Sequence, residues 1–417
     1  MQEEFNKELL DFLDSSVTPF HATALMVEMF EQKGFIALDE TKLWNLEEGK
    51  SYYVVRNESA IIAFTYPKGA KNYLMVGTHN DSPSLKLKPN VVVEGNGVVQ
   101  LGVEPYGGAL LNSWFDRSLS LAGVVYYLNS EGEVLHSTID FKKPLATIPS
   151  LAIHLDSQAN KDKTINKQID LVPILATSTQ KKFNFESFLK QKLPQDAQEI
   201  LSYELSFYDT NKAEYIGIEE DFIASSRLDN LLSCFVGAKF ISESSSAKPL
   251  LFIANNHEEV GSETTTGAAG SFLENTLKRI FPHYEEFVQV CRSSLLISAD
   301  NAHAVHPNFA SKHEPNHTPH INKGVVLKHN ANQRYATSAK TSALFLAAAK
   351  KANLPTQNYV VRSDMGCGST IGPISATRLG IETLDIGLPT LAMHSIRELC
   401  GSEDAYNLVK ILKHIEL

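Results

Sequence analysis

Five residues with metal-binding side chains directly follow, or lie close behind, predicted buried strands of this sequence. Histidine nitrogens and carboxylate oxygens are the ligands that zinc takes in catalytic sites, where one position stays open for water. In an open α/β sheet, the carboxyl ends of the strands border the crevice in which ligands bind, so these side chains are expected to converge. The five residues are His79, Glu258, Glu259, Asp300 and His394.

Asp229, at the start of the predicted helix RLDNLLSC (227–234), adds a further carboxylate. The inventory is then two histidines and three carboxylates, with one glutamate left over. Two metal ions about 4 Å apart need a carboxylate that bridges them. Five ligands divide evenly between two ions only if one is shared, and our hypothesis is that Asp229 is the shared one.

The adjacent pair Glu258 and Glu259 suggests two different roles. On an extended backbone, neighbouring side chains point to opposite sides, so one can bind metal while the other faces a bound water. A carboxylate that contacts the water without binding metal is what a general base requires. We assign Glu259 as the ligand and Glu258 as the base, although the opposite assignment fits the sequence nearly as well. Asp81, two residues after His79, is expected to accept the other ring N–H of that histidine.

At these positions the sequence resembles the aspartyl aminopeptidases, which are cocatalytic zinc exopeptidases with a dimerisation domain inserted in an aminopeptidase fold. The shared motifs follow one another in order along nearly the whole chain. They are THNDSPSLKLKP (78–89), SWFDRSLSLAG (113–123), SSRLDN (225–230), NHEEVGS (256–262), SADNAHAVHPN (298–308), KHNANQRYATSA (328–339), CGSTIGP (367–373) and MHSIRE (393–398).

The resemblance implies two Zn²⁺ ions per subunit, for which Co²⁺ or Mn²⁺ can substitute. One ion would be bound by His79, Asp229 and Asp300, and the other by Asp229, Glu259 and His394. These ligand sets agree with the reading of the residues above. They are also more definite than the spacing of the residues could support.

The resemblance further implies that Glu258 is the general base and that Asp81 supports His79. The implied reaction is metal-assisted hydrolysis of the N-terminal residue, Asp or Glu, from peptides with a free N-terminus. Other dinuclear zinc hydrolases, such as an N-acyl amino-acid deacylase or a carboxypeptidase, could use the same ligands. An aminopeptidase of broader or different specificity is a further alternative, and an inactive structural shell or cargo protein would be favoured only by loss of Glu258 or a ligand.

Three more residues are candidates for substrate binding. Lys328 would supply the cation that an acidic substrate side chain requires, because burying an unpaired carboxylate is costly; its alternative is a solvated surface charge. His303 belongs to a histidine-rich loop expected to line the cleft. His154 matches a family histidine that a neighbouring subunit contributes to the active site, and its alternative is a partly buried β-strand histidine.

The order of predicted elements indicates an α/β fold, with a mainly parallel sheet covered by helices and an inserted, largely antiparallel β domain. We assign residues 1–90 and 213–417 to the catalytic domain and 91–212 to the inserted dimerisation domain. Within the insertion, residues 113–125 show a helical period, and 156–200 read as an exposed loop with a short helix. The first 16 residues predict an amphipathic helix.

Composition excludes several classes of function. The 417 residues carry a net charge of −10 without basic clusters, so neither nucleic acid nor an anionic membrane is an expected partner. No apolar run approaches the roughly 20 residues of a membrane span. Four cysteines without a CxxC pair suit a reducing compartment, and we expect a cytoplasmic protein. The resemblance implies a homo-oligomer, a dodecamer built from dimers.

Overall fold

The computed structural model describes residues 1–178 and 183–417. Its chain separates into two compact units, the first formed by residues 1–81, 213–393 and 398–417, and the second by residues 82–212 and 394–397. The second unit begins at residue 82, shortly before strand β5 (Ser84–Gly95). This strand continues through residue 91, where the sequence placed the start of the inserted domain. In the part of the chain described, no helix is long and apolar enough to cross a membrane.

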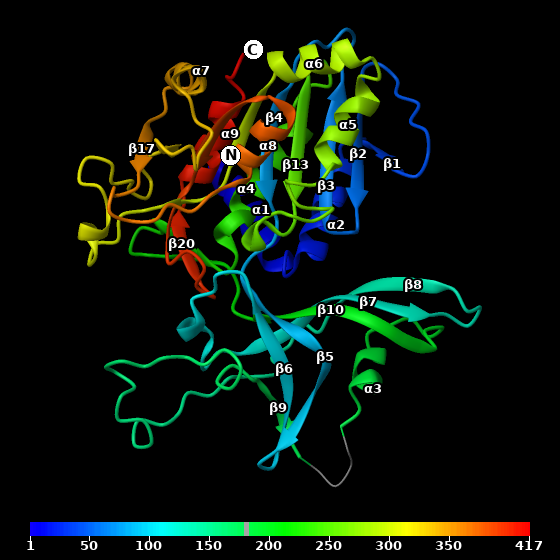
Figure 1. Ribbon diagram of the computed structural model, residues 1–417, viewed down its shortest axis with the longest axis vertical. Helices are drawn as coiled ribbons and strands as arrows, with labels where there is room; N and C mark the ends of the chain where they lie inside the picture. Colours follow the sequence, from blue (N-terminus) through cyan, green and yellow to red (C-terminus); the bar gives the residue numbers. More distant parts are fainter. Residues whose placement is uncertain (179–182) are drawn as a thin grey trace. The chain divides into compact units, whose positions relative to one another are not determined.

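The first unit is built on a nine-stranded mixed sheet, seen with its helices in Figure 1. The pairs β1–β2, β13–β4, β4–β14, β14–β18 and β16–β17 are parallel, and β2–β3, β3–β13 and β16–β18 are antiparallel. In sheet order the strands are β1 (Ile36–Leu38), β2 (Lys50–Arg56), β3 (Ala60–Tyr66), β13 (Leu250–Asn255), β4 (Leu74–His79), β14 (Leu295–Ala299), β18 (Glu382–Gly387), β16 (Val325–His329) and β17 (Thr356–Val360).

Eight helices of this unit accompany the sheet. They are α1 (Gln2–Ser15), α2 (Pro19–Glu31), α4 (Leu228–Ser242), α5 (Phe272–Ile280), α6 (Tyr284–Ser293), α7 (Ala339–Lys351), α8 (Ile371–Leu379) and α9 (Asp404–Leu412). The predicted first helix is confirmed by α1, whose buried Phe5, Leu9 and Leu13 recur at helical spacing.

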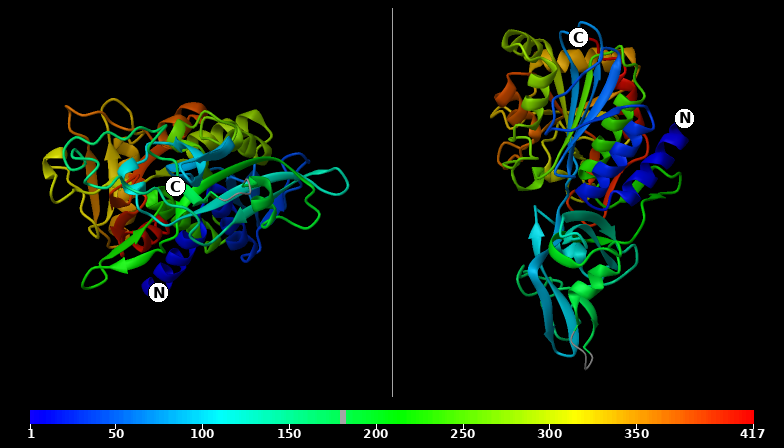
Figure 2. Two further views of the ribbon diagram at one scale, coloured as in Figure 1. Left: turned by 90° about the horizontal axis from the view of Figure 1, so that it is seen from below. Right: turned by 90° about the vertical axis from the view of Figure 1, so that its right-hand side faces the viewer.

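Helices cover both faces of the central strands, which are buried throughout. Leu74 and Val76 of β4 pack with α1, α2, α4 and α9, whereas Met75 packs with α5 and α6. Alternating side chains of a strand point to opposite faces, so two cores form on one sheet. The right-hand view of Figure 2 shows α1 and α2 on one side and the α5–α6 pair on the other. The α/β class expected from the sequence is confirmed.

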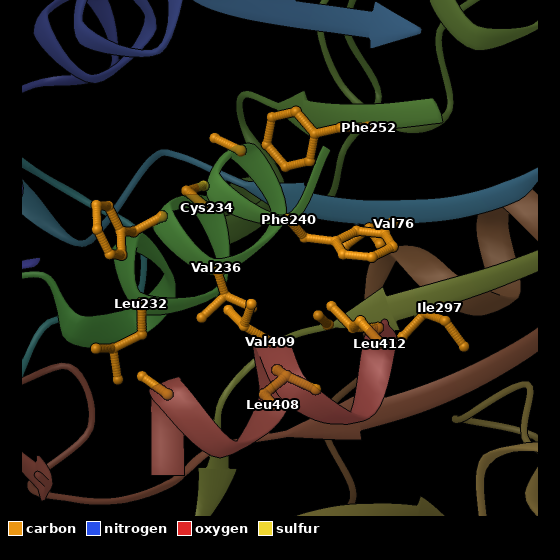
Figure 3. Packing of buried hydrophobic residues seen from close by; sticks show 14 of the residues in the cluster. Val76, Leu232, Cys234, Val236, Phe240, Phe252, Ile297, Leu408, Val409 and Leu412 are labelled. Carbon is orange, nitrogen blue, oxygen red and sulfur yellow. The ribbon is translucent and has the colours of Figure 1, made fainter. Parts of the chain in front are cut away.

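Helix α4 lies between the sheet and α9 and carries the metal-ligand candidate Asp229 in its first turn. A Cβ at Gly237 would lie 2.5 Å from the Phe252 ring, so glycine permits the close approach of helix and strand. Figure 3 shows the side chains of this layer, labelled as Val76, Leu232, Cys234, Val236, Phe240, Phe252, Ile297, Leu408, Val409 and Leu412.

A second, five-stranded sheet completes the first unit. Its order is β11 (Glu214–Ile216), β12 (Phe222–Ser225), β20 (Glu398–Gly401), β19 (Pro389–Leu391) and β15 (Ala302–His303). It joins the segment before α4 to the segment after residue 397.

The second unit contains a six-stranded sheet in which every pairing is antiparallel. Its order is β8 (Val134–Asp140), β7 (Leu119–Leu128), β10 (Glu199–Asp209), β5, β6 (Val98–Tyr106) and β9 (Ile174–Thr177). A short helix α3 (Phe185–Lys190) follows the residues at 179–182, which lie outside the described structure.

The helical period predicted over residues 113–125 is wrong for most of its length. Only Leu111–Trp114 forms a 3₁₀ turn, and β7 begins at Leu119. Residues 119–125 are all buried, so the strand lacks the alternation of apolar and polar residues that identifies a half-exposed strand.

Candidate metal centre

His79 is the last residue of β4 and is 1% exposed. Its Nε2 lies 3.5 Å from Asp229 Oδ1, 3.6 Å from Asp300 Oδ1 and 4.0 Å from Glu258 Oε2. Its Nδ1 lies 3.1 Å from the carbonyl oxygen of Asp81 and 3.4 Å from Asp81 Oδ1. One imidazole nitrogen therefore faces three carboxylates, while the other is oriented by Asp81.

Two of those carboxylates lie at the ends of secondary-structure elements, Asp300 just after β14 and Asp229 at the start of α4. Asp300 directly follows β14, and its N–H donates to Ile386 O at 3.0 Å. Asp229 lies in the first turn of α4 with non-helical backbone angles, φ −84° and ψ 106°. The side-chain amide of the next residue, Asn230, donates to Ala299 O at 2.8 Å and so ties the start of α4 to the end of β14.

The backbone at Glu258 and Glu259 is not extended, which corrects the premise of the sequence argument. Both residues lie in a 3₁₀ turn, Glu258–Val260, which follows His257 in the left-handed region at φ 62°. With three residues per turn, neighbouring side chains diverge by about 120° instead of pointing to opposite sides. The two carboxylates can still take different roles, but this follows from the turn and not from a strand.

Asp81 determines where that turn lies. Its Oδ1 accepts the N–H of Glu258 and its Oδ2 accepts the N–H of Glu259, each at 3.1 Å. A carboxylate at the start of a helical turn satisfies amides that have no partner within the turn. One buried aspartate thus orients the His79 ring and also places both glutamates, which is more than the sequence predicted for it.

The electrostatics of this cluster are those of a cation site. Burial, followed by the charges of Asp300, Glu259 and Asp229, raises the pKa of Glu258 to about 8 despite the opposing charge of His79. Burial opposes a charge on His79, yet Glu258 and the aspartates around it raise the pKa of His79 well above its usual value. Buried carboxylates in this number are costly unless a cation compensates them.

The donor atoms fit a metal ion. One set of ligand atoms from His79, Asp229 and Asp300, and another from His79, Glu258 and Glu259, each lie within 4.8 Å of one another. Imidazole nitrogen and carboxylate oxygen form the donor set of catalytic zinc. All of these residues belong to the first unit.

Lys328 lies on β16 and is 3% exposed, so the alternative of a solvated surface charge is wrong. Its Nζ lies 3.5 Å from Asp300 Oδ2 and 5.5 Å from the centre of the Tyr335 ring. His303 lies on β15 and is partly accessible to solvent, although many protein atoms surround its ring. This burial of the ring, followed by the positive charge of Lys328, lowers the pKa of His303. Both residues are thus electrostatically linked to Asp300.

The two remaining predicted site residues belong to the second unit. His394 has its Nδ1 3.2 Å from Gly108 O. His154 lies in an exposed turn, so its alternative as a partly buried strand histidine is wrong. Its neighbours Leu151, Ile153 and Leu155 are 53%, 53% and 77% exposed, and none of the three lies in a strand.

Sequence reasoning missed two buried residues that contact the ligand segments. The thiol of Cys234 donates to His79 O at 3.0 Å, and burial raises its pKa to about 12, which keeps it protonated. Glu398 Oε2 accepts the N–H of Asp229 at 2.9 Å. Nothing in the spacing of these residues could have found them, although Glu398 lies within the motif MHSIRE.

Comparison with known proteins gives a consistent result over the whole chain. The Aminopeptidase I zinc metalloprotease (M18) family matches residues 12–415. The probable M18 family aminopeptidase 2 of Pseudomonas fluorescens strain Pf0-1 is 50% identical over 99% of this chain and 98% of the relative.

Solved structures agree with this match. A chain from the cryo-EM structure of the Ape4 and Nbr1 complex is 37% identical, covers 99% of this chain and 85% of its own, and superposes with a TM-score of 0.95. The S. cerevisiae mApe1 dodecamer is 26% identical, with a TM-score of 0.85 over 98% of this chain and 95% of its own. This chain therefore belongs to the M18 family of zinc metallo-aminopeptidases, which confirms the family and the enzyme class that its motifs predicted.

Proposed function

We propose that this enzyme removes an N-terminal Asp or Glu from peptides with the help of two zinc ions. The observation that carries the proposal is the position of His79 Nε2, which faces Asp229 and Asp300 at 3.5 and 3.6 Å. His79, Asp229 and Asp300 would hold one ion. Asp229, Glu259 and His394 would hold the other, as the resemblance implies.

The zinc ions, when bound, would lower the pKa of a water molecule and polarise the substrate carbonyl. Glu258 is the residue that we propose to take the proton from this water and to pass it to the leaving amine. Its carboxylate lies 4.0 Å from His79 Nε2 and is 15% exposed, so it can reach both the cluster and substrate. Asp81 holds the backbone of Glu258 and thereby the position of the base.

Selectivity for an acidic N-terminal residue is assigned to Lys328. A buried ammonium group next to the cluster can pair with a substrate carboxylate that would otherwise be buried without a partner. The ion pair with Asp300 supports this role because it restrains a side chain that is normally flexible. His303, which is electrostatically linked to Lys328, is proposed to contact the substrate as well.

The proposed active site includes a residue from a neighbouring subunit, so the enzyme would need to assemble into an oligomer. The exposed position of His154 supports a role in the active site of a neighbouring subunit, in a homo-oligomer such as the dodecamer described for S. cerevisiae mApe1. The second unit would supply the contacts between subunits. The cytoplasm is the proposed compartment, since Cys234, Cys291 and Cys400 are free and buried.

The test is a panel of fluorogenic Asp, Glu, Leu and Lys amides, each with a free and an acetylated amine, given to zinc- or cobalt-loaded enzyme. Release from free-amine Asp and Glu only would support the proposal. Release from Leu or Lys would keep the mechanism and contradict the specificity. Cleavage of acetylated compounds only would favour a deacylase.

A second experiment assigns the specificity to one residue. Lys328→Met, which keeps the length of the side chain and removes its charge, should lower turnover of Asp and Glu amides far more than turnover of Leu amide. Lys312→Met, at an exposed lysine of the same unit, is the matched control. Equal losses on all amides would show that Lys328 acts only through Asp300.

A further inference from the structure

We propose that Glu398 is a positioning residue that holds the backbone of Asp229 so that its carboxylate can be shared by two metal ions. The inference rests on the two-zinc function proposed above and adds to it a residue that binds neither metal nor substrate. Glu398 is 3% exposed, and its Oε2 accepts the Asp229 N–H at 2.9 Å.

The hydrogen bond from the Asp229 N–H to Glu398 lies in the first turn of α4, where the helix itself provides no acceptor. The first amides of a helix have no acceptor within the helix, and Asp229 in addition departs from helical angles. A buried N–H without an acceptor is destabilising, because the group loses its hydrogen bonds to water and gains none in return. Glu398 satisfies this amide and so stabilises the non-helical conformation from which the Asp229 side chain reaches to 3.5 Å from His79 Nε2.

A second bond fixes the same segment from the other side. The Asn230 side chain donates to Ala299 O at 2.8 Å, directly before Asp300. Asp229 is thus held between β20, through Glu398, and the end of β14, through Asn230. A carboxylate that must reach two ions tolerates little displacement, because each ion requires its own coordination geometry.

Glu398 lies close in sequence to a proposed zinc ligand. It begins β20, pairs with Ser225 of β12 three residues before Leu228, and follows the proposed ligand His394 by four residues in sequence. One short segment therefore supplies both a proposed zinc ligand and the anchor of the shared carboxylate. Loss of the anchor should weaken zinc binding without removing any ligand.

The experiment is a zinc titration of chelator-treated full-length protein, followed by calorimetry and by metal analysis after dialysis against buffered free zinc. Glu398→Ala removes the acceptor, whereas Glu398→Gln keeps an oxygen that can accept the Asp229 N–H. We expect the affinity for the more weakly bound zinc to fall about 10–100-fold in the alanine variant, as for other partners of metal ligands, and to stay within about threefold in the glutamine variant.

Asp404→Ala is the matched control. Asp404 is also a buried carboxylate, 2% exposed, that accepts backbone N–H groups, those of Asn322 at 2.7 Å and Gly324 at 3.1 Å. Its removal should lower the melting temperature and leave zinc affinity unchanged. If Glu398→Ala does not fold, Glu398→Asp, one methylene shorter, replaces it as the variant that withdraws the acceptor.

Parent-like zinc affinity in Glu398→Ala or its aspartate replacement would overturn the proposal, as would an equal loss in Asp404→Ala, which would indicate general destabilisation. A glutamine variant as weak as the alanine variant would overturn the acceptor role. If the parent itself binds one zinc per subunit, the two-ion function fails separately, and the effect of Glu398 on that single ion decides the positioning role.

Discussion

The metal centre and the segment around His154 are two regions of one predicted active site, and the described structure supports them in opposite ways. His79 and the side chain of Asp229 are 1% and 5% exposed and are held by hydrogen bonds from several elements of the first unit. Leu151, Ile153 and Leu155, beside His154, are more than half exposed. Larger groups of exposed apolar residues often mark interaction sites, whereas single ones are common on any protein surface. The first region is held by contacts within one subunit, whereas the second is the part of the proposed site that we expect a partner subunit to cover.

Removing the proposed base, Glu258, should have the largest effect on the activity of the metal centre. Glu258→Gln should lower kcat about 10²–10⁴-fold, the usual contribution of a general base, while both zinc ions remain bound. Glu259→Gln should instead lose zinc, which metal analysis distinguishes. The exposed Glu263, in the same loop, gives the control Glu263→Gln with parent activity. Zinc loss in the Glu258 variant would reverse the two assignments.

Removing the side chain of Asp81, which holds the backbone of the proposed base, should have the next largest effect. Asp81→Ala removes the acceptor for two backbone amides and the nearest carboxylate to His79 Nδ1. We expect zinc affinity and kcat each to fall about 10–100-fold. Zinc affinity that is unchanged while kcat falls would show that Asp81 acts on the glutamate turn alone. Parent values for both would contradict its role.

The second region is tested by mixing subunits. His154→Ala alone should lower kcat/KM about tenfold, corresponding to one hydrogen bond to a charged group of ~1.5 kcal/mol. Oligomers reassembled from His154→Ala and Glu258→Gln subunits should regain activity, because a site with an intact Glu258 can receive His154 from its neighbour. Leu155→Lys should reduce the oligomer size in mass photometry. Mixtures no more active than their components would place His154 outside the neighbouring site.

The smallest effect on activity is expected from the interior carboxyl of Asp404. Burial raises its pKa from 3.8 to about 6, against the backbone bonds from Asn322 and Gly324. The folded protein then holds this proton more tightly than the unfolded chain, so the stability from this group is present at low pH and is lost as pH rises from about 4 through 6, by on the order of 3 kcal/mol.

The measurement compares melting temperatures of parent and Asp404→Asn in chelator-treated protein between pH 4 and 7. The difference between the two curves should change across this interval in favour of the variant as pH rises. A constant difference would show that Asp404 has the same pKa in both states.

Much of the metal centre could be predicted because its residues lie at strand ends. His79 and Asp300 end apolar runs, and the edge of a sheet brings such positions together whatever the intervening chain does. The glutamate pair was located correctly for the same reason, but its backbone was not. A left-handed His257 and the acceptors on Asp81 create a 3₁₀ turn that no local pattern shows.

Other features depended on contacts between distant residues. The pairing of Lys328 with Asp300 and the bond from Asp229 to Glu398 join residues 28 and 169 positions apart, so local spacing carries no sign of them. Residues 119–125 were misread because a strand buried on both faces has no period. The turn at His154 was misread because exposed apolar residues resemble buried ones in sequence.

The sequence by itself determined the family, the chemistry of the ligands and the α/β class, since residue types and strand periodicity are local properties. Only the tertiary structure decided which acceptors hold those ligands and which side chains are exposed. Hydrogen bonds and burial depend on neighbours brought together by the fold, and it is these neighbours that turn a set of histidines and carboxylates into a site for metal ions.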